Sequence, residues 1–235
     1  MKPLFLQFVI FSLSICLYGQ DTAYNQRDSQ GRHHGLWRGY HECGQLRYEG
    51  TFKNGVPQNT FKHYYASGNL RSKVMHKNDG KTAEAIHYFE NGRKMSEGTY
   101  VNQKKDGLWK YYHQSGVLIS KEYYEMGKKN GLSKTFYQDG QLSKKENWKD
   151  DKKNGPAVHY YSDGTLKNEM VYKNDRLHGL FKFYYPGNNR VFMSGMYVDN
   201  LKDGVWMSFD ERGRAIRREE FDEGRRISEE VFNGQ

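Results

Sequence analysis

Residues 35–55 read GLWRGYHECGQLRYEGTFKNG, a stretch with one Trp, three Tyr or Phe and five Gly but no catalytic set. Residues 59–79, NTFKHYYASGNLRSKVMHKND, repeat much the same arrangement 24 residues later. Recurrence at a fixed period of about 20 to 50 residues is the sequence signature of a repeat protein. The period, and not a site motif, therefore decides the fold.

Two series of residues carry this period along the chain, and we expect both to be structural. The first is an aromatic residue at one phase: Tyr40, Tyr64, Tyr88, Tyr112, Phe136, Tyr160, Tyr184 and, after one inserted residue, Phe209. The second is a glycine four residues later: Gly44, Gly68, Gly92, Gly116, Gly140 and Gly164. Residues that recur in every unit maintain a scaffold more often than they perform a reaction, because one reaction needs one constellation.

Each unit contains two short runs rich in Tyr, Phe, Val and Thr, separated by a turn that bears glycine. Pairs such as Asn54-Gly55, Asn130-Gly131, Asn154-Gly155 and Asp203-Gly204 adopt positive φ easily, as tight hairpin turns require. No apolar stripe recurs every 3.6 residues or so, which argues against helices. The sequence therefore predicts an all-β fold, an elongated single-layer antiparallel meander of about eight stacked β-hairpin repeats.

The repeat unit is similar to that of a known family. Its pattern is clearest in Gly107-Leu108-Trp109, Tyr112, Gly116, Leu118, Tyr124 and Gly127. This pattern resembles the MORN repeat, and more closely the 24-residue bacterial variant found in proteins named YwqK-family antitoxins. The resemblance covers about residues 31–228. It implies a curved single layer of β-hairpins that serves as a scaffold for proteins or, in some MORN proteins, for membrane lipids.

The N-terminus has the pattern of a secretory signal peptide. Lys2 precedes an apolar run from Leu4 to Tyr18, which is shorter than the roughly 20 residues of a bilayer span. A retained anchor and a lipid-modified Cys16 are the alternatives. We expect a signal peptide at residues 1–19, an N-terminal cap at 20–34, the MORN-like array at 35–228 and a C-terminal tail at 229–235. The mature chain would then be periplasmic, outer-surface or secreted, in a bacterium.

The composition is that of a folded but highly solvated chain. There are 37 Lys and Arg against 28 Asp and Glu, giving a net charge of +9, yet aromatic residues make up 15%. The mean hydropathy is −1.01. Disordered chains are poor in aromatic residues, so a thin sheet with much surface fits better. Export disfavours nucleic acid as the partner of this basic chain.

One set of aromatic residues is expected on the face opposite Tyr40, because successive strand residues point to opposite faces. An exposed apolar face usually binds a partner, so we expect this set to be a protein-binding surface. The alternative is that the rings only cover a thin sheet. The candidate partner-binding residues are Trp37, Phe61, Trp109, Tyr111, Phe181 and Trp206.

A second candidate surface is a basic rim formed by lysines in the loops between units. With strands about 4.8 Å apart, successive units lie roughly 10 Å from each other, so the fields of these loops add partially. Such a rim fits anionic lipid or an envelope polymer, and solvated turns that keep sheet edges soluble are the alternative. The candidate anion-binding residues are Lys104, Lys105, Lys128, Lys129, Lys152 and Lys153.

Three further chemistries are weakly supported by the sequence. His33, His34, His41 and Cys43 lie close together, but their spacing matches no zinc pattern. Gly80-Lys81-Thr82 resembles the end of a phosphate-binding loop without its earlier glycine. Serines and histidines recur at repeat positions without forming a triad. We therefore predict no metal, no cofactor and no enzymatic activity.

The sequence predicts an exported, non-enzymatic repeat scaffold that mediates protein–protein interaction. The alternative function is association with anionic membrane lipid or a cell-envelope polymer through the basic rim. The protein partner is unidentified, and the oligomeric state is left open.

Overall fold

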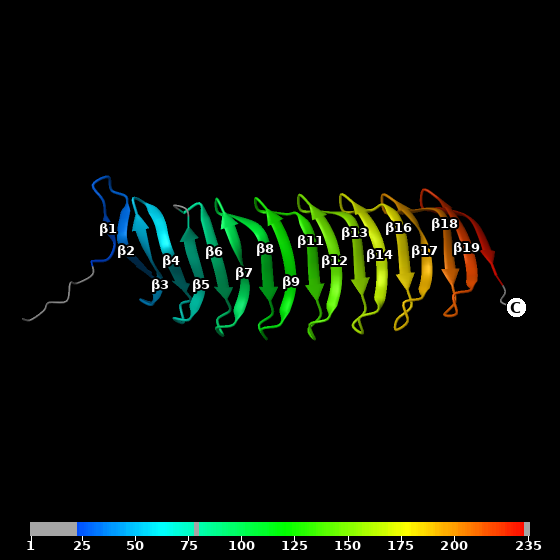
Figure 1. The fold of residues 1–235 in the computed structure, drawn as a ribbon, viewed down its shortest axis with the longest axis horizontal. Helices are drawn as coiled ribbons and strands as arrows, with labels where there is room; N and C mark the ends of the chain where they lie inside the picture. The colour runs from blue at the N-terminus through cyan, green and yellow to red at the C-terminus, as the bar shows by residue number, and fades with distance from the viewer. Residues whose placement is uncertain (1–22, 78–79, 233–235) are drawn as a thin grey trace, which may run out of the picture.

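The computed structural model describes residues 23–77 and 80–232, so the predicted signal peptide lies outside the described residues. The described residues form twenty strands and no helix. All strands belong to one antiparallel sheet that follows the chain as a meander. The array is elongated, with its strands side by side across the long axis from the N-terminal to the C-terminal end (Figure 1). The predicted all-β architecture is confirmed.

The bounds of the strands in chain order are β1 Gln26–Arg27, β2 His33–Tyr40, β3 Leu46–Lys53, β4 Val56–Tyr64, β5 Leu70–Lys77, β6 Thr82–Tyr88, β7 Lys94–Val101, β8 Lys104–Tyr112, β9 Leu118–Glu125, β10 Lys128–Lys129, β11 Gly131–Phe136, β12 Leu142–Lys149, β13 Lys152–Tyr160, β14 Leu166–Lys173, β15 Arg176–Leu177, β16 Gly179–Tyr184, β17 Val191–Val198, β18 Leu201–Phe209, β19 Ala215–Asp222 and β20 Arg225–Val231.

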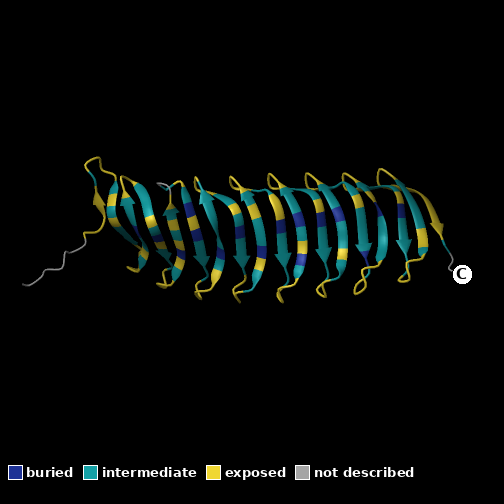
Figure 2. Cartoon of the chain, in the orientation of Figure 1, coloured by how far each residue is buried: buried dark blue, intermediate teal, exposed yellow. Residues whose placement is uncertain are grey.

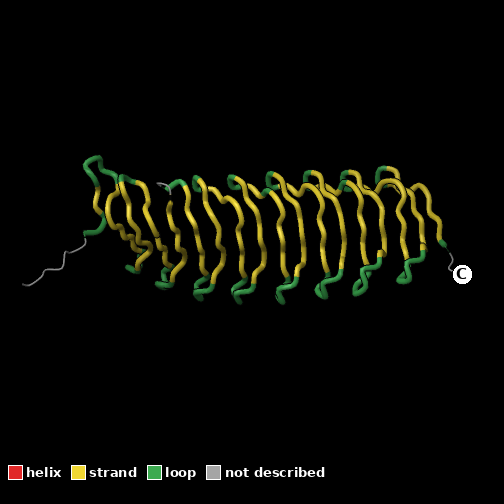
Figure 3. The backbone as a smooth tube through the Cα atoms, viewed as in Figure 1, coloured by secondary structure: helices red, strands yellow, loops and turns green. Residues whose placement is uncertain are grey.

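The recurring glycine closes the turn between the two strands of a unit. Gly44, with φ of 84°, donates its N–H to the carbonyl of His41 at 2.9 Å, and Gly116, with φ of 93°, does the same to His113 at 2.8 Å. The recurring aromatic ends the first strand at a register shift, as at Tyr112 beside Tyr111. These turns form one edge of the array in Figure 3.

The turns between units agree with the prediction at Asn54-Gly55 and differ from it at the other three predicted pairs. They are two-residue turns with positive φ at both positions, as in Asn54 (53°) and Gly55 (81°) or Asp150 (50°) and Asp151 (66°). Asn and Asp tolerate this conformation, so the turn needs no glycine. Gly155 instead lies inside β13, at a register shift against β12. The assignment of Asn154-Gly155 to a hairpin turn was wrong, and Asn130-Gly131 and Asp203-Gly204 likewise lie beyond their turns.

Burial is concentrated on one side of the sheet, which we call the ring face. It bears the six candidate partner-binding residues, and the dark blue positions in Figure 2 run across the strands. Because one sheet has no second layer, each large side chain there packs against the neighbouring strand. Trp109 lies directly over Gly98, where an added Cβ would be 2.4 Å from the ring. Glycine at this position therefore makes room for the indole.

The same packing alternates in size along the array. Phe61 lies over Gly50, and Trp206 lies over Gly195, with an added Cβ at 2.5 Å and 2.2 Å from the ring. Where the earlier strand carries a carboxylate, the later residue is small: Glu146 precedes the buried Ala157. Volume is therefore matched from strand to strand, as close packing requires.

Tyrosine hydroxyls connect one unit to the next. Tyr65 donates to the carbonyl of Tyr88 at 2.7 Å, and Tyr137 donates to the carbonyl of Tyr160 at 2.6 Å. His41 reaches the carbonyl of Tyr64 at 3.0 Å in the same way. Each bond satisfies the carbonyl of the recurring aromatic at its register shift.

Each end of the array has one further strand pairing. β1 pairs with the start of β2 within the predicted N-terminal cap. β20 pairs with β19 through Val231, so residues 229–231 of the predicted tail are part of the sheet. All residues of β20 are exposed and many are charged, which is how natural sheets discourage edge-to-edge association.

We expect Gly195→Ala to lower the free energy of unfolding by about 1–3 kcal/mol, because the methyl group overlaps the ring of Trp206. Equilibrium urea unfolding followed by tryptophan fluorescence measures this. The matched control is Ser194→Ala, on the adjacent residue and the opposite face, which should change stability by less than about 0.5 kcal/mol. Equal effects of the two substitutions would contradict the packing described here.

Candidate functional site

Trp109 is the centre of an aromatic cluster on the ring face. Its ring lies 4.9 Å from Tyr100, edge to face, and its Nε1 donates to the carbonyl of Thr99 at 3.0 Å. Lys105 Nζ lies 4.8 Å above the ring. Only 1% of Trp109 is exposed. This residue is therefore part of the core and has no free surface to offer a partner.

Trp206 is enclosed in the same way four units further along. Its ring lies 4.9 Å from Tyr197 and 6.0 Å from Phe181, and its Nε1 donates to the carbonyl of Met196 at 3.1 Å. Lys202 Nζ lies 4.3 Å above it. Trp206 is also 1% exposed.

The expectation that the predicted rings form an exposed face is wrong for Trp109, Trp206 and Phe61, all of which are buried. The other three, Trp37, Tyr111 and Phe181, are half-buried within the same clusters. Alternation along the strands did place all six on one face. In a single layer, however, that face is where rings of successive strands pack together and lysines cover them.

The six predicted rim lysines divide into two sets, because adjacent residues of a strand face opposite ways. Lys104, Lys128 and Lys152 are exposed beside the turns, and Lys128 pairs with Asp150 at 3.4 Å. Lys105, Lys129 and Lys153 instead lie half-buried over the rings of Trp109, Trp148 and Tyr172. A continuous rim of six lysines is therefore not present.

A chain of polar contacts connects the central units of the ring face. Lys105 donates to the hydroxyl of Tyr111 at 2.6 Å, and Tyr111 donates to Tyr124 at 3.2 Å. Tyr124 donates to Glu122 at 2.6 Å, and Lys129 pairs with the same carboxylate at 3.0 Å. Burial and the adjacent Glu122 raise the pKa of Tyr124. The phenol therefore stays protonated, accepting from Tyr111 and donating to Glu122.

Glu146 anchors the next part of this chain of contacts. Its Oε1 accepts hydrogen bonds from Lys153 Nζ at 2.8 Å and from His159 Nε2 at 3.2 Å. The bond from His159, together with Lys153, lowers the pKa of Glu146 to about 2. The carboxylate is therefore ionised, paired and buried, which is the arrangement of a structural ion pair and not of a general base.

The serine and histidine positions of the ring face form no nucleophilic site. Ser72 Oγ lies 3.2 Å from His63 Nδ1, which is the distance of a nucleophile from its base. Ser72 is buried, and burial followed by Arg71 lowers the pKa of His63. Within the described residues no carboxylate pairs with His63, so the third member of a triad is missing.

The first histidines and Cys43 do not come together as metal ligands. His33 stacks on Trp37 at 3.6 Å, His41 bonds to the backbone, and Cys43 is exposed. No group of three or more potential metal ligands occurs among the residues that the structure describes.

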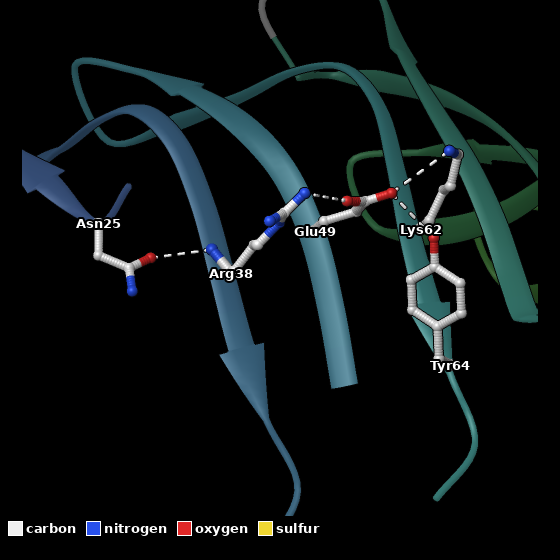
Figure 4. Close-up of polar contacts among 5 residues, drawn as sticks. All are labelled: Asn25, Arg38, Glu49, Lys62 and Tyr64. Atoms are coloured by element: carbon white, nitrogen blue, oxygen red, sulfur yellow. Dashed lines mark hydrogen bonds and ion pairs between the residues drawn. The ribbon is translucent and has the colours of Figure 1, made fainter. Parts of the chain in front are cut away.

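The opposite face has a different chemistry, shown for the first units in Figure 4. Glu49 accepts a hydrogen bond from Tyr64 at 2.8 Å and pairs with Lys62 at 3.3 Å and Arg38 at 3.5 Å. The hydrogen bond from Tyr64, followed by Lys62, lowers the pKa of Glu49. Asn25 accepts the backbone N–H of Arg38 at 2.8 Å. Charges of both signs therefore alternate across these strands.

The opposite face also carries exposed apolar residues over its C-terminal half. Each lies one residue before or after a ring-face position, and cross-strand pairs such as Leu180 with Met196 connect them. Leu180, Met196 and Val205 are 47%, 44% and 42% exposed. Leu108 and Val171 at related positions are half-buried, and the polar Asn147 on β12 stands opposite Leu132. Apart from Asn147, we call the whole set the apolar row: Leu108, Tyr123, Leu132, Pro156, Val171, Leu180, Met196 and Val205.

The repeats match a family model described as MORN repeat variant. The matched segments are residues 34–54, 57–78, 81–102, 105–126, 129–150 and 153–174, which together are more than half of the chain. The chain belongs to this MORN repeat family. MORN repeats are generally modules for protein interaction or membrane binding, and the family is generally non-enzymatic. The hairpins β16–β17 and β18–β19 continue the MORN array beyond the matched segments.

Comparison with solved structures adds no functional argument. The crystal structure of TarM aligns with 50% of this MORN chain at 8% identity and a TM-score of 0.25, and the chain spans 20% of TarM. A porin-like protein from Bacteroides uniformis aligns with 83% of the chain, and with 91% of its own length, at 11% identity and a TM-score of 0.21. The search among curated proteins found no match. In the part of the MORN array that is described, no helix is long and apolar enough to cross a membrane.

Sequence reasoning missed two features of this MORN array, the polar contacts around Glu146 and the apolar row. Lys153 and His159 are 7 and 13 residues from Glu146 and come together through the pairing of β12 with β13. The apolar row had a signal in the sequence, since a large apolar residue often directly precedes the ring-face position, as in Leu108 before Trp109.

We expect Glu146→Gln to change the acid sensitivity of the fold. The folded-state pKa of about 2 lies below the usual 4.5, so the ionised group contributes stability that is fully present above about pH 4.5 and is lost as the pH falls toward 2. The variant should be less stable than the natural chain by about 1–3 kcal/mol at neutral pH, and this difference should disappear near pH 2.

Urea unfolding at several pH values measures the difference. The control is Glu230→Gln on β20, an exposed residue, for which the difference should be small at every pH. A difference for Glu146→Gln that stays constant with pH would show that the charge contributes nothing.

Proposed function

We propose that this protein is an exported, non-enzymatic MORN scaffold that recruits another protein through the apolar row. The observation that carries the proposal is the exposure of Leu180, Met196 and Val205 on the open side of a single sheet. Exposed apolar patches on soluble proteins usually mark an interaction site. The ring face offers less free apolar surface, because Trp109 and Trp206 are buried there among other rings and lysines.

The length of the apolar row fits a protein partner. It crosses the strands from β8 to β18, and at about 4.8 Å per strand this is on the order of 40 Å. A surface of this length corresponds to a standard protein interface and exceeds a small-molecule pocket. The proposal includes the export predicted from residues 1–19 and the closer likeness to the 24-residue YwqK-type units. It assigns no toxin to the chain.

The alternative function, association with anionic lipid or an envelope polymer, rests on fewer residues than the sequence suggested. Lys104, Lys128 and Lys152 remain exposed beside the turns, and one of them is paired with Asp150. Three charges spaced by roughly 10 Å give a weak field at physiological salt. The apolar row therefore supports protein recruitment better than the rim supports surface association.

We expect the triple variant Leu180→Ser, Met196→Ser, Val205→Ser to reduce partner capture at least about tenfold, since central apolar residues of an interface each contribute roughly 1 kcal/mol or more. The measurement is crosslinking capture from the native envelope fraction at low and high salt, with quantitative mass spectrometry. All three residues are exposed, so circular dichroism should show an unchanged fold.

The matched control is Ile227→Ser with Val231→Ser, two exposed apolar residues of β20 outside the apolar row. Capture by this control should be unchanged. If the triple variant captures the same proteins as the natural chain, the apolar row is not the recruiting surface. If the chain captures only lipid or polymer, and this capture is lost at high salt, the function is surface association through Lys104, Lys128 and Lys152.

A further inference from the structure

Four lysines on the opposite face stand directly across from one another on successive strands. Lys110 on β8 pairs with Lys121 on β9, Lys121 with Lys134 on β11, and Lys134 with Lys145 on β12. We call these four residues the lysine row. Neighbouring strands are about 4.8 Å apart, and like charges directly opposite each other destabilise a sheet.

The lysine row interrupts a pattern of alternating charge. In the same transverse row of the sheet, Glu49 pairs with Lys62, Glu97 pairs with Lys110, and Glu169 lies 3.9 Å from Lys182. Lys73 on β5 is an earlier exception, because it stands opposite Lys62 and has no ion pair among the described residues. Lysine occupies the corresponding position in the second unit, as Lys73, and in two consecutive central units, as Lys121 and Lys145. The MORN repeat therefore accommodates a carboxylate at this position, and two consecutive units carry the opposite charge.

The lysine row is nearly without acidic partners. Lys110 reaches Glu97 at 3.2 Å at one end of the row. Among the described residues, no carboxylate lies within ion-pairing distance of Lys121, Lys134 or Lys145. Three uncompensated charges on adjacent strands favour an anionic ligand.

Neighbouring rings hold the lysines in place. Lys121 Nζ lies 6.0 Å from the ring of Phe136, and Lys145 Nζ lies 5.5 Å from the ring of Tyr160. In the units with glutamate, a tyrosine hydroxyl at the equivalent place donates to the carboxylate, as Tyr112 does to Glu97 at 2.7 Å. Phe136 has no hydroxyl, so the aromatic residue beside Lys121 suits a cation and not an anion.

The lysine row runs beside the first part of the apolar row. Leu108, Tyr123 and Leu132 are each two residues from a lysine of the row on the same strand. Residues two apart on a strand share a face and lie roughly 6.6 Å from each other. The central units therefore present two parallel rows, one cationic and one apolar, that both cross the strands.

We propose that this pair of rows is the docking site for an acidic amphipathic α-helix of the partner protein, lying along the array axis. The inference rests on the proposed function and names the chemistry of the segment recruited. One helical turn rises about 5.4 Å, which is close to the strand spacing. Carboxylates on one side of the helix can therefore contact the lysine row, while apolar residues on the adjacent side contact the apolar row. An extended peptide or a phosphate polymer would engage the cationic row and leave the apolar row exposed.

The test uses helical peptides of about 18 residues, roughly five turns, with fluorescence anisotropy against the full-length chain. The acidic amphipathic peptide has Glu on one side and Leu on the adjacent side. A scrambled peptide has the same composition without segregated sides, and a third has Lys in place of Glu. Vesicles containing phosphatidylglycerol and long-chain polyphosphate are tested in parallel.

We expect only the acidic amphipathic peptide to bind well, and Lys121→Glu with Lys145→Glu to weaken that binding at least about tenfold. The double substitution restores alternating charge, so the fold should be retained. Lys104→Glu with Lys152→Glu changes the net charge equally at the turns and should change binding less than about twofold. Leu132→Ser should also weaken binding, because the apolar row takes part.

Equal binding of the scrambled peptide, or no binding of the acidic peptide, would overturn the proposal. Binding of vesicles or polyphosphate, but not of peptide, through Lys121 and Lys145 would overturn it in favour of that ligand. The wider function is tested separately by partner capture. If capture depends on Leu180, Met196 and Val205 but not on the lysine row, recruitment stands and the acidic-helix site does not.

Discussion

The array depends on one constraint, which is that a single sheet must bury its large side chains against its own neighbouring strands. Trp109 over Gly98 and Trp206 over Gly195 meet this constraint most fully. A ring can lie flat on the sheet only where the strand before it carries no side chain. Large and small residues therefore alternate from strand to strand on the ring face. A carboxylate such as Glu146 occupies a ring-face position where no ring is present.

Lysine takes the role that a second layer has in other sheet proteins. The ammonium groups of Lys105 and Lys202 lie over the indoles of Trp109 and Trp206 in cation–π contact. Around Glu146 the same kind of lysine is paired with a carboxylate. A chain with a mean hydropathy of −1.01 can therefore fold, because part of its basic charge belongs to the packing.

The repeat period was sufficient to predict the hairpins, the turn at Gly44 and the phase of Tyr40, because all three depend on local sequence. It was not sufficient to predict which face is enclosed, so Trp109 was expected at the surface. Adjacent lysines such as Lys128 and Lys129 were grouped together although they face opposite ways. The lysine row was missed because Lys110, Lys121, Lys134 and Lys145 meet only through strand register, at separations of 11 and 13 residues. Periodicity at 24 residues does not show such pairs.

The continuous pairing of strands also fixes distances along the molecule. The lysine row on β8 to β12 and the exposed apolar residues on β16 to β18 belong to one sheet without an intervening linker. The distance between these two groups is therefore set by the number of strands between them and by the fixed spacing of neighbouring strands. Gain or loss of a whole unit during evolution would move one group relative to the other in steps of roughly 10 Å, and would leave the chemistry of each unchanged.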